Sequence, residues 1–296
     1  MFEYLDDNPV FSKSFEEEST MKKTLAFVLS ATMMMAALVG CGSSETAETK
    51  AETTAETAGT EAEGDKVWIV ATDTVFKPFE YTNENNEFVG IDVEIHAAIA
   101  EDQGFENELQ SLGWDAAVAA VQVGQADAII AGATIKQERI DNGWIFSDGY
   151  YDATQTFVVP SSSDIASFED LAGKNIAVKN GTAGADFANK LKDEYGFTVS
   201  VFEDSPTMYQ DVLLGNSAAC VEDKPIILSN IKENGLELKV PEGMESEGAP
   251  YGFAIMDTAD QELLDMFNAG LANIKANGTY DEILAKYLGE LFRRIL

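Results

Sequence analysis

Short apolar runs alternate with amphipathic segments along the chain from residue 66 onward. Runs such as "VWIVAT" and "NIAV" are typical of buried strands, and the strands that we predict span residues 66–72, 126–134, 174–181, 218–223 and 251–256. Apolar residues recur at helical spacing between them, and the helices that we predict span residues 90–105 (after a strand-like start), 115–124, 182–195, 205–217, 224–235, 259–278 and 279–289. Ser205 is expected to cap its helix, with Pro206 at the first helical position. This alternation predicts an α/β fold with mainly parallel sheets.

Polar clusters follow several of the predicted strands. In an open α/β sheet, ligands bind beyond the carboxyl ends of the strands. A core strand needs neither an acid nor an aromatic ring at its end, so these clusters indicate a ligand site. The residues concerned are Asp73 and Phe76, then Gly132, Thr134 and Arg139, then Lys179, Gly181 and Thr182, and finally Asp223.

The composition is that of an acidic globular protein. The chain has 296 residues, is 45% hydrophobic and carries a formal net charge of −33. The hydrophobic share is enough for a full core, and the length suits one large or two medium domains. The negative charge argues against nucleic acid as a partner, because binding to the phosphate backbone requires a basic patch. It also argues against adsorption to anionic lipid.

The sequence lacks the motifs of common catalytic and cofactor sites. No zinc-ligand spacing, EF-hand loop, Walker motif or dinucleotide fingerprint is present. The only histidine, His96, lies on the flank of a predicted helix, where we expect a surface residue. A Ser-His-Asp arrangement is therefore not expected. We predict a protein that is not an enzyme and that holds no metal and no cofactor.

Residues 21–40 have the three-part pattern of a secretory signal peptide. Lys22 and Lys23 form its basic start, an apolar run follows, and small residues precede Cys41 in "LVGC". This ending resembles a bacterial lipobox, in which the cysteine is lipidated and becomes the first residue of the mature protein. Residues 1–20 precede the pattern, and we interpret them as a mis-assigned start, with Met21 as the true first residue.

Residues 41–65 are rich in Glu, Thr, Ala and Ser and show no apolar periodicity. Such a segment cannot bury enough apolar surface to fold, which predicts a disordered acidic tether. The tether would join the lipid on Cys41 to the folded part, at the extracytoplasmic face of the cell membrane. With Cys41 lipidated, Cys220 would have no disulfide partner and would act as a small hydrophobic residue in its strand.

Several separated motifs resemble the bacterial solute-binding proteins for polar amino acids, which serve ATP-binding-cassette importers. The motifs are "ATDTVFKPFEYTNENNEFVGIDVEIHAAIA", "AGATIKQERIDNGWIFSDGYY", "AVKNGTAGADFA" and "NGTYDEILAKYLG", and they occur in the order of the family. The likeness covers residues 67–288, and it is greatest to the glutamine-binding members. The final segment "ELFRRIL" resembles nothing in these motifs.

The resemblance implies two α/β lobes, joined by two crossing strands, that close on a ligand like a hinged trap. The first lobe would hold residues 66–151 and 251–296, and the second lobe would hold residues 152–250. The crossings would lie near "YYDATQ" and "GAPYGF". The protein would be a monomer that passes its ligand to the transmembrane permease of the importer.

The resemblance further implies a site for both charged ends of a free amino acid. Arg139 would bind the carboxylate with its planar fork, helped by Thr134 and by backbone N–H groups where a helix begins. Asp223 and the carbonyl of Gly132 would accept hydrogen bonds from the ammonium group. The full set of implied ligand contacts is Asp73, Phe76, Trp114, Ala131, Gly132, Thr134, Arg139, Lys179, Thr182, Ala183, Glu222 and Asp223.

The contacts expected for the ligand side chain favour glutamine. Phe76 and Trp114 would sandwich its methylene stem, and Asp73 with Lys179 would offer an acceptor and a donor to its amide. Glu222 adds a negative charge that would admit a cationic side chain if it points inward, so a basic amino acid or cystine is the alternative within the family. An enzyme similar to cyclohexadienyl dehydratases, with Glu222 as an acid, is the alternative of another class.

Overall fold

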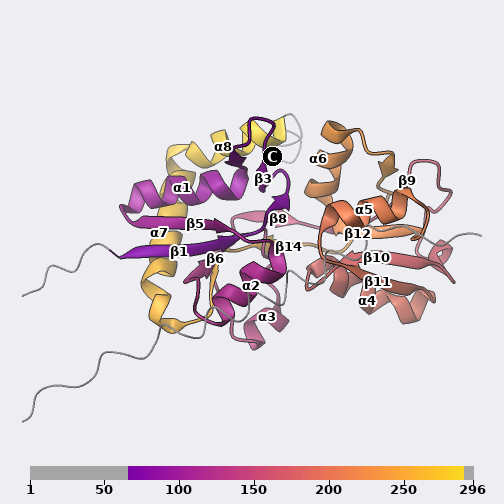
Figure 1. Ribbon diagram of the computed structural model, residues 1–296, viewed down its shortest axis with the longest axis horizontal. Helices are drawn as coiled ribbons and strands as arrows, with labels where there is room; N and C mark the ends of the chain where they lie inside the picture. The colour runs from indigo at the N-terminus through magenta and orange to yellow at the C-terminus, as the bar shows by residue number, and fades with distance from the viewer. Residues whose placement is uncertain (1–65, 290–296) are drawn as a thin grey trace, which may run out of the picture. The chain divides into compact units, whose positions relative to one another are not determined.

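The computed structural model describes residues 66–289 (Figure 1). These residues belong to one compact unit, which spans Glu61–Leu296. Several predictions concern residues outside this range and stay predictions: the start at Met21, the signal peptide, the lipidated Cys41 and the tether. The final "ELFRRIL" also lies outside the described residues.

A first five-stranded sheet has the strand order β5-β1-β6-β15-β7. Its strands are β1 (Val67–Thr72), β5 (Glu106–Ser111), β6 (Ala128–Ile129), β7 (Ile145–Phe146) and β15 (Ala254–Ile255). β1 pairs in parallel with β5 and β6, whereas β15 pairs antiparallel with β6 and β7. A small antiparallel sheet follows β1 and consists of β2 (Val75–Phe76), β3 (Glu80–Thr82) and β4 (Phe88–Val89).

Helices cover both faces of the first sheet (Figure 1). On one face lie α1 (Ile91–Gln103), α7 (Gln261–Asn277) and α8 (Thr279–Leu288), and on the other lies α2 (Trp114–Gln122), with the short α3 (Gln137–Asp141) near it. Successive strand residues point to opposite faces. Val70 accordingly joins the apolar cluster of α1, α7 and α8, while its neighbour Ala71 joins the cluster of α2. A one-turn 3-10 helix, Thr258–Asp260, leads into α7.

A second five-stranded sheet has the strand order β11-β10-β12-β9-β13. Its strands are β9 (Gln155–Pro160), β10 (Asn175–Lys179), β11 (Thr198–Phe202), β12 (Ala219–Asp223) and β13 (Leu238–Lys239). The apolar cluster on one face contains α4 (Ala183–Tyr195), and the cluster on the other contains residues of α5 (Ser205–Leu213) and α6 (Lys224–Asn234). A 3-10 helix, Glu169–Leu171, precedes β10.

Two strands connect the sheets. β8 (Tyr151–Ala153) and β14 (Ala249–Tyr251) pair antiparallel, with Tyr151 opposite Tyr251. β8 continues into β9 of the second sheet, and β14 continues into β15 of the first. We call the first sheet with its helices the first lobe and the second sheet with its helices the second lobe. This is the two-lobed α/β fold that the sequence predicts.

Each lobe places a crevice at the carboxyl ends of its central strands. In the first sheet β1 lies between β5 and β6, and in the second β10 lies between β11 and β12. In each sheet the chain passes from the central strand to the neighbour on one side and then to the neighbour on the other side, so the strand order reverses at the central strand. Such reversal points of strand order are where open α/β sheets bind ligands. Asp73 follows β1 at the first crevice, and Lys179 and Asp223 end β10 and β12 at the second.

The structure corrects some local predictions. The sheets are parallel only over β5, β1 and β6 and over β11, β10 and β12; β9 and β15 run antiparallel because each enters directly from a connecting strand without a helical crossover. The polar strand β5, "ENELQS", was not predicted, because it is a half-exposed edge strand without an apolar run. The cap of α5 is Asp204, whose side chain accepts a hydrogen bond from the N–H of Thr207, and Ser205 is already helical.

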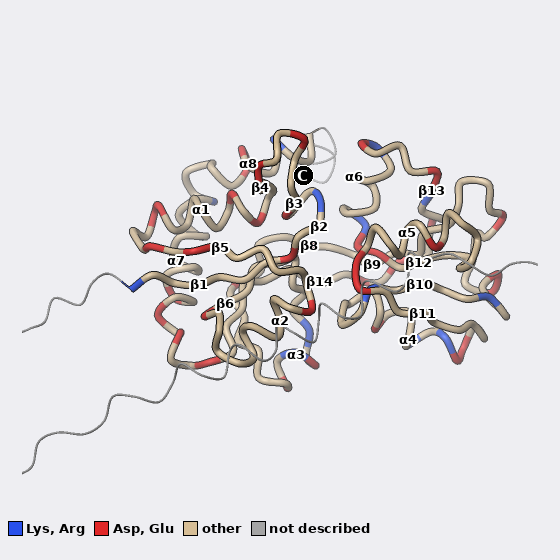
Figure 2. Tube along the Cα trace, in the orientation of Figure 1, with Lys and Arg blue, Asp and Glu red and all other residues tan. Residues whose placement is uncertain are grey.

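Acidic residues occur along both lobes and outnumber basic ones (Figure 2). Cys220 is a free cysteine, fully buried in β12, as predicted for a small hydrophobic residue. Among residues 66–289, no helix has the length and apolar character needed to span a membrane.

Candidate ligand-binding site

Residues of both lobes surround one cavity at the facing crevices. About 360 Å³ of this space is free of protein atoms, and part of it is open to solvent. All of the ligand contacts implied by the sequence line this cavity. The lining residues are Asp73, Phe76, Trp114, Ala131, Gly132, Thr134, Arg139, Lys179, Thr182, Ala183, Gly184, Glu222 and Asp223.

The guanidinium of Arg139 is held on one wall of the cavity. Its Nη1 donates to the carbonyl of Thr134 at 2.8 Å, and its Nη2 donates across to the carbonyl of Gly181 in the second lobe at 3.2 Å. The Cζ atom lies 4.8 Å from the ring centroid of Trp114 and 5.1 Å from that of Trp144. Burial lowers the pKa of Arg139 to about 10, so it stays charged at neutral pH. Further N–H donors of this rigid fork remain for an anionic group.

The N-terminus of α4 adds hydrogen-bond donors to the cavity. Thr182 caps the helix, its hydroxyl accepting from the N–H of Ala185 at 3.2 Å and donating to the carbonyl of Lys179 at 2.8 Å. The first backbone N–H groups of a helix have no partner within the helix and attract anions. Because Thr182, Ala183 and Gly184 all line the cavity, it combines a guanidinium with a helix N-terminus, a pairing suited to a carboxylate.

Asp223 supplies a carboxylate at the end of β12. Its Oδ1 accepts from the amide of Gln155 at 2.9 Å, and its Oδ2 accepts from the hydroxyl of Tyr251 at 2.5 Å. Burial and the nearby charge of Glu222 together raise the pKa of Asp223 to about 6, against the opposing effects of Tyr251, Gln155 and Arg139. A buried acid of this kind gains from a cationic partner in the cavity.

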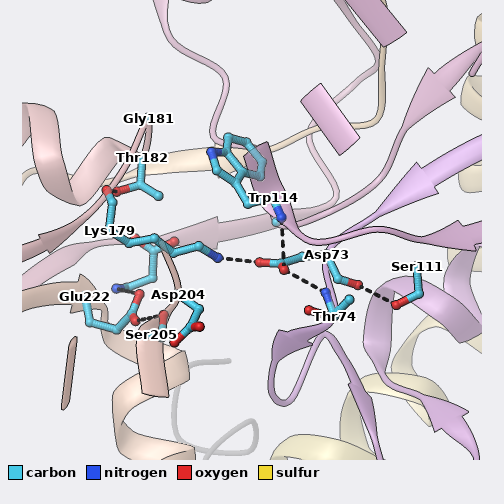
Figure 3. Close-up of polar contacts among 12 residues, drawn as sticks. Asp73, Thr74, Ser111, Trp114, Lys179, Gly181, Thr182, Asp204, Ser205 and Glu222 are labelled. Atoms are coloured by element: carbon cyan, nitrogen blue, oxygen red, sulfur yellow. Dashed lines mark hydrogen bonds and ion pairs between the residues drawn. The ribbon is translucent and has the colours of Figure 1, made fainter. Parts of the chain in front are cut away.

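Glu222 is committed to other protein groups. Its Oε2 accepts from the hydroxyls of Ser205 at 2.6 Å and Tyr209 at 2.7 Å, and its Oε1 accepts from the N–H of Asp223 at 2.9 Å. Figure 3 shows the contact with Ser205. These bonds occupy both carboxylate oxygens, so Glu222 borders the cavity chiefly as a support for Asp223.

Gly132 brings the backbone close to the cavity. Its φ of 55° is in the left-handed region, and its N–H donates to Oδ2 of Asp92 at 2.7 Å. A Cβ at this position would lie 2.4 Å from Cε1 of Phe76, closer than any real contact. Only glycine therefore allows this loop to pass beside the ring of Phe76.

The other end of the cavity holds an ion pair between the lobes. Lys179 of the second lobe reaches Oδ2 of Asp73 in the first (Figure 3), and each residue is 3% exposed. Oδ1 of Asp73 accepts from the N–H groups of Thr74 at 2.6 Å and Trp114 at 3.1 Å. The ring of Phe76 lies beside Lys179, whose Nζ is 5.5 Å from the ring centroid. The cavity thus ends in a nearly neutral pair flanked by apolar rings.

More contacts between the lobes surround the cavity. Lys136 pairs with Asp186, and the amide of Asn180 donates to Asp115 at 2.9 Å. Together with the bond from Arg139 to the carbonyl of Gly181, they join the lobes around the site. The lobes are therefore in a closed arrangement, and their contacts are polar ones that water can replace on opening.

Some residues of the site were not predicted from the sequence. Gly184 lines the cavity, and Gln155 and Tyr251 hold the carboxylate of Asp223. Gln155 and Tyr251 lie in or beside the segments predicted as crossings, "YYDATQ" and "GAPYGF", so their neighbourhood was marked although their contact with Asp223 was not. Gly184 directly follows Ala183, and its small size lets α4 pack on Val221, whose carbonyl would be 3.2 Å from an added Cβ.

The expectation that His96 lies on the surface was wrong. The residue is 1% exposed, stacks on Phe253 with ring centroids 6.2 Å apart, and its Nε2 lies 3.1 Å from Oδ1 of Asn107. The flank of α1 that carries His96 faces β5 and the apolar core, and burial lowers the pKa of His96 to about 4. His96 does not line the ligand cavity. Between residues 66 and 289, no group of His, Cys, Asp or Glu side chains is arranged to hold a metal ion.

The geometry defines a type II two-lobed binding protein of the α/β class. Residues 68–290 match the family of bacterial extracellular solute-binding proteins, family 3, and the chain belongs to this family. The arginine-binding extracellular protein ArtP of Bacillus subtilis is 31% identical over 274 residues, covering 90% of this chain and 98% of that protein. The glutamine-binding protein GlnH of an ABC transporter of Bacillus subtilis is 30% identical, covering 91% and 98%.

Solved structures agree with this family and with the closed arrangement. An ancestral arginine-binding protein bound to arginine is 34% identical, with a TM-score of 0.70 over 75% of this chain and 98% of that one. The second substrate-binding domain of GlnP of Lactococcus lactis, in an open conformation, is 40% identical, but its TM-score is 0.54 over 76% and 96%. An ancestral amino acid-binding protein, a precursor of cyclohexadienyl dehydratase, is 32% identical, with a TM-score of 0.67 over 75% and 95%.

Proposed function

We propose that this protein captures a free polar α-amino acid, L-glutamine by preference, and delivers it to the permease of an ATP-binding-cassette importer. The observation that carries the proposal is that Arg139 of the first lobe and Asp223 of the second line the same cavity. A free α-amino acid is the small molecule that brings a carboxylate and an ammonium group to two such groups at once. The family membership supports the same class of ligand.

The ligand carboxylate would lie against the fork of Arg139 and the N-terminus of α4. The ammonium group would lie against Asp223 and the carbonyl of Gly132. Because Arg139 and Asp223 belong to different lobes, a ligand that contacts both binds the closed arrangement more tightly than the open one, and it shifts the population accordingly.

The preference for glutamine rests on the far end of the cavity. The ammonium of Lys179 can donate to the carbonyl of an amide, and the carboxylate of Asp73 can accept from its NH₂ group. A cationic side chain would meet Lys179 directly, and the oxygens of Glu222 already accept hydrogen bonds from Ser205, Tyr209 and a backbone N–H. Phe76 and Trp114 would contact the methylene stem on its two faces.

Calorimetry on the folded protein, freed of carried-over ligand, tests the proposal. We expect L-glutamine to bind, and Arg139→Ala to lose about 2–5 kcal/mol of binding free energy, roughly thirtyfold or more in Kd, because a desolvated carboxylate would lack its partner. Lys190→Ala, an exposed lysine on α4, serves as the matched control and should bind normally. Equal affinity of Arg139→Ala and the wild type for every amino acid would refute this assignment of the site.

A basic ligand is the second candidate, because ArtP and the ancestral protein bound to arginine are both similar to this chain. For arginine to bind in the same cavity, Lys179 would have to leave Asp73, whose carboxylate would then receive the guanidinium. Competition between L-arginine and L-glutamine for the wild-type protein decides between the two ligands.

An enzymatic function is the candidate of another class, suggested by the similarity to a precursor of cyclohexadienyl dehydratase. The acid considered for it, Glu222, accepts three hydrogen bonds from protein groups, so both of its oxygens are engaged by the protein itself. Turnover of prephenate or arogenate by the purified protein would establish this activity, and its absence would leave the binding function.

The anchor and the partners complete the proposal. Lipidation at Cys41 would hold the protein at the extracytoplasmic face of the membrane, beside the permease, as a monomer. Cys41→Ala should then release the protein from the membrane fraction; continued membrane association of that variant would contradict the lipid anchor. Sedimentation at equilibrium measures the oligomeric state.

A further inference from the structure

Two acidic side chains are buried together beneath the cavity. Glu80 of β3 and Asp92 in the first turn of α1 are both 0% exposed. Within the described part of the chain, three of their oxygens have no hydrogen-bond partner: both oxygens of Glu80 and Oδ1 of Asp92. Burying an ionised carboxylate without a partner is costly, and two neighbouring carboxylates raise the cost further. The three unpartnered oxygens therefore call for a proton between these groups.

The remaining oxygen of Asp92 holds two functional parts of the fold. Its Oδ2 accepts from the N–H of Gly132 at 2.7 Å and from the hydroxyl of Tyr150 at 2.8 Å. Gly132 lines the ligand cavity, and Tyr150 directly precedes the connecting strand β8. Asp92 thus fixes the ligand loop after β6 to the start of the connection between the lobes.

The surroundings favour one protonated acid and one carboxylate. The segment that carries Glu80 is bonded to the first turn of α1, because the N–H of Asp92 donates to the carbonyl of Phe79, the residue before Glu80, at 2.9 Å. Burial raises the pKa of Glu80 well above its usual value, with the charges of Asp92 and Asp73 adding to the effect and that of Lys179 opposing it. Burial also raises the pKa of Asp92, to about 6 after the opposing effect of its bonds to Gly132 and Tyr150. Two tyrosines are the other titratable groups near the pair: Tyr150, which donates to Asp92, has a pKa raised by burial and by both acids, and Tyr280 of α8 has a pKa raised mainly by burial, with a small effect of the charge of Asp92.

We propose that Glu80 and Asp92 share one proton at neutral pH, with Glu80 donating to Oδ1 of Asp92, and that this pair positions Gly132 for the ligand. The second half of the proposal rests on the proposed function, whereas the first half does not. The proton gives Oδ1, the one unpartnered oxygen of Asp92, a donor and leaves Asp92 negative, which strengthens its bonds to Gly132 and Tyr150. Loss of the proton would place two carboxylates side by side and push the loop away.

The shared proton is tested on the ligand-free protein. The wild type at pH 7 should show the infrared band of a protonated carboxyl group, and Glu80→Gln, which keeps a donor without a charge, should lack it. A group whose pKa is raised by folding loses its stabilising effect as the pH rises through the folded value. The melting temperature of the wild type should therefore fall, relative to that of Glu80→Gln, between pH 5 and pH 9.

The positioning role is tested with L-glutamine as the probe. Glu80→Leu, which removes the donor, should weaken the binding of L-glutamine roughly tenfold, whereas the conservative Glu80→Gln, which keeps a donor, should rescue the affinity. At high pH the wild type should lose affinity as the pair loses its proton, and Glu80→Gln should not. Ile99→Ala, in the core of α1 away from the loop, is the control: it should lower the melting temperature and leave Kd unchanged.

The outcomes separate the two halves of the proposal. A folded wild type without the infrared band, or with a band that Glu80→Gln retains, overturns the shared proton. The positioning role is overturned if Glu80→Leu binds L-glutamine as tightly as the wild type does. If Glu80→Leu does not fold, the positioning role is overturned by a Kd that depends on pH equally in the wild type and in Glu80→Gln. A wild type that binds no L-glutamine refutes the proposed ligand, and the infrared and melting data still decide on the proton.

Discussion

The ion pair of Lys179 and Asp73 is the residue-scale feature on which the proposed selectivity rests. Both side chains are almost fully buried, and each belongs to a different lobe. Buried ion pairs contribute little net stability, because desolvation offsets their attraction. A pair that closes the ligand cavity is therefore better explained by what it does to the ligand: it offers a donor and an acceptor together, and it repels a second cation.

Lys179→Met should shift the selectivity from glutamine toward arginine. Without the ammonium, Asp73 keeps only its two backbone donors, and an arginine side chain can supply the missing charge. We expect the ratio of the Kd for arginine to the Kd for glutamine to fall by at least about tenfold, measured by calorimetry with both ligands.

Lys224→Met is the control for this change, because Lys224 pairs with Glu245 on the surface and does not line the cavity. It should leave the ratio unchanged. Equal losses of affinity for both amino acids in Lys179→Met would show that Lys179 serves the shared zwitterion and not the side chain.

At the scale of elements, the site is made by chain segments that leave the ends of strands. The loop after β6 passes beside Phe76 at Gly132, and α4 begins at the cavity directly after β10. In the second lobe, α5 begins at Ser205, the residue predicted as its cap, and the hydroxyl of Ser205 donates to Glu222. These local details decide which groups remain available to a ligand.

Gly132→Ala should weaken ligand binding through the loop after β6. The added Cβ would overlap Phe76, so the loop or the ring must move and the ammonium and side-chain contacts move with it. We expect at least a roughly tenfold increase in Kd, in addition to about 1 kcal/mol of lost stability from the left-handed backbone.

Gly124→Ala is the matched control. Gly124 also has a positive φ, of 70°, but an added Cβ would meet nothing within 4 Å. It should reproduce the loss of stability in thermal unfolding and leave Kd unchanged. If both variants bind normally, close approach at Gly132 does not matter for the ligand.

At the scale of the whole molecule, closure brings an acid from one lobe and a guanidinium from the other to one cavity. Lys136–Asp186 and Asn180–Asp115 join the lobes beside it, and such partly exposed polar contacts are individually weak. The higher TM-score with the arginine-bound protein than with the open domain of GlnP fits a closed arrangement. Under the proposed function, the ligand would be the component that stabilises closure.

Ligand affinity should fall as the pH falls through about 6. The ammonium group requires the charged form of Asp223, whose pKa is raised to about 6, so the site is mostly ionised at pH 7 and mostly protonated at pH 5. We expect roughly a tenfold increase in Kd for L-glutamine between these values, measured by calorimetry.

Asp223→Asn is the comparison for the pH effect, because its amide cannot titrate. This variant should bind weakly at both pH values, with a flat profile. An equally steep profile in Asp223→Asn would assign the titration to another group.

Much of the fold and the site follows from local sequence. The apolar runs at β1, β10 and β12 are buried strands because they have no other way to leave water, and the polar residues after them collect at the sheet edge because parallel strands end together. Places after strands and the family resemblance therefore predicted four residues of the candidate site: Arg139, Asp223, Gly132 and Lys179.

Other features depend on partners that are distant in the chain. β5 is a strand only because β1 pairs with it, and His96 is buried only because β5 and Phe253 cover its helix. The direction of Glu222 was open in the sequence, since a residue at a strand end can face either the cavity or its own lobe; the hydroxyls of Ser205 and Tyr209 decided it. Local pattern determines which residues leave water, whereas hydrogen bonds between distant segments determine where each polar group ends.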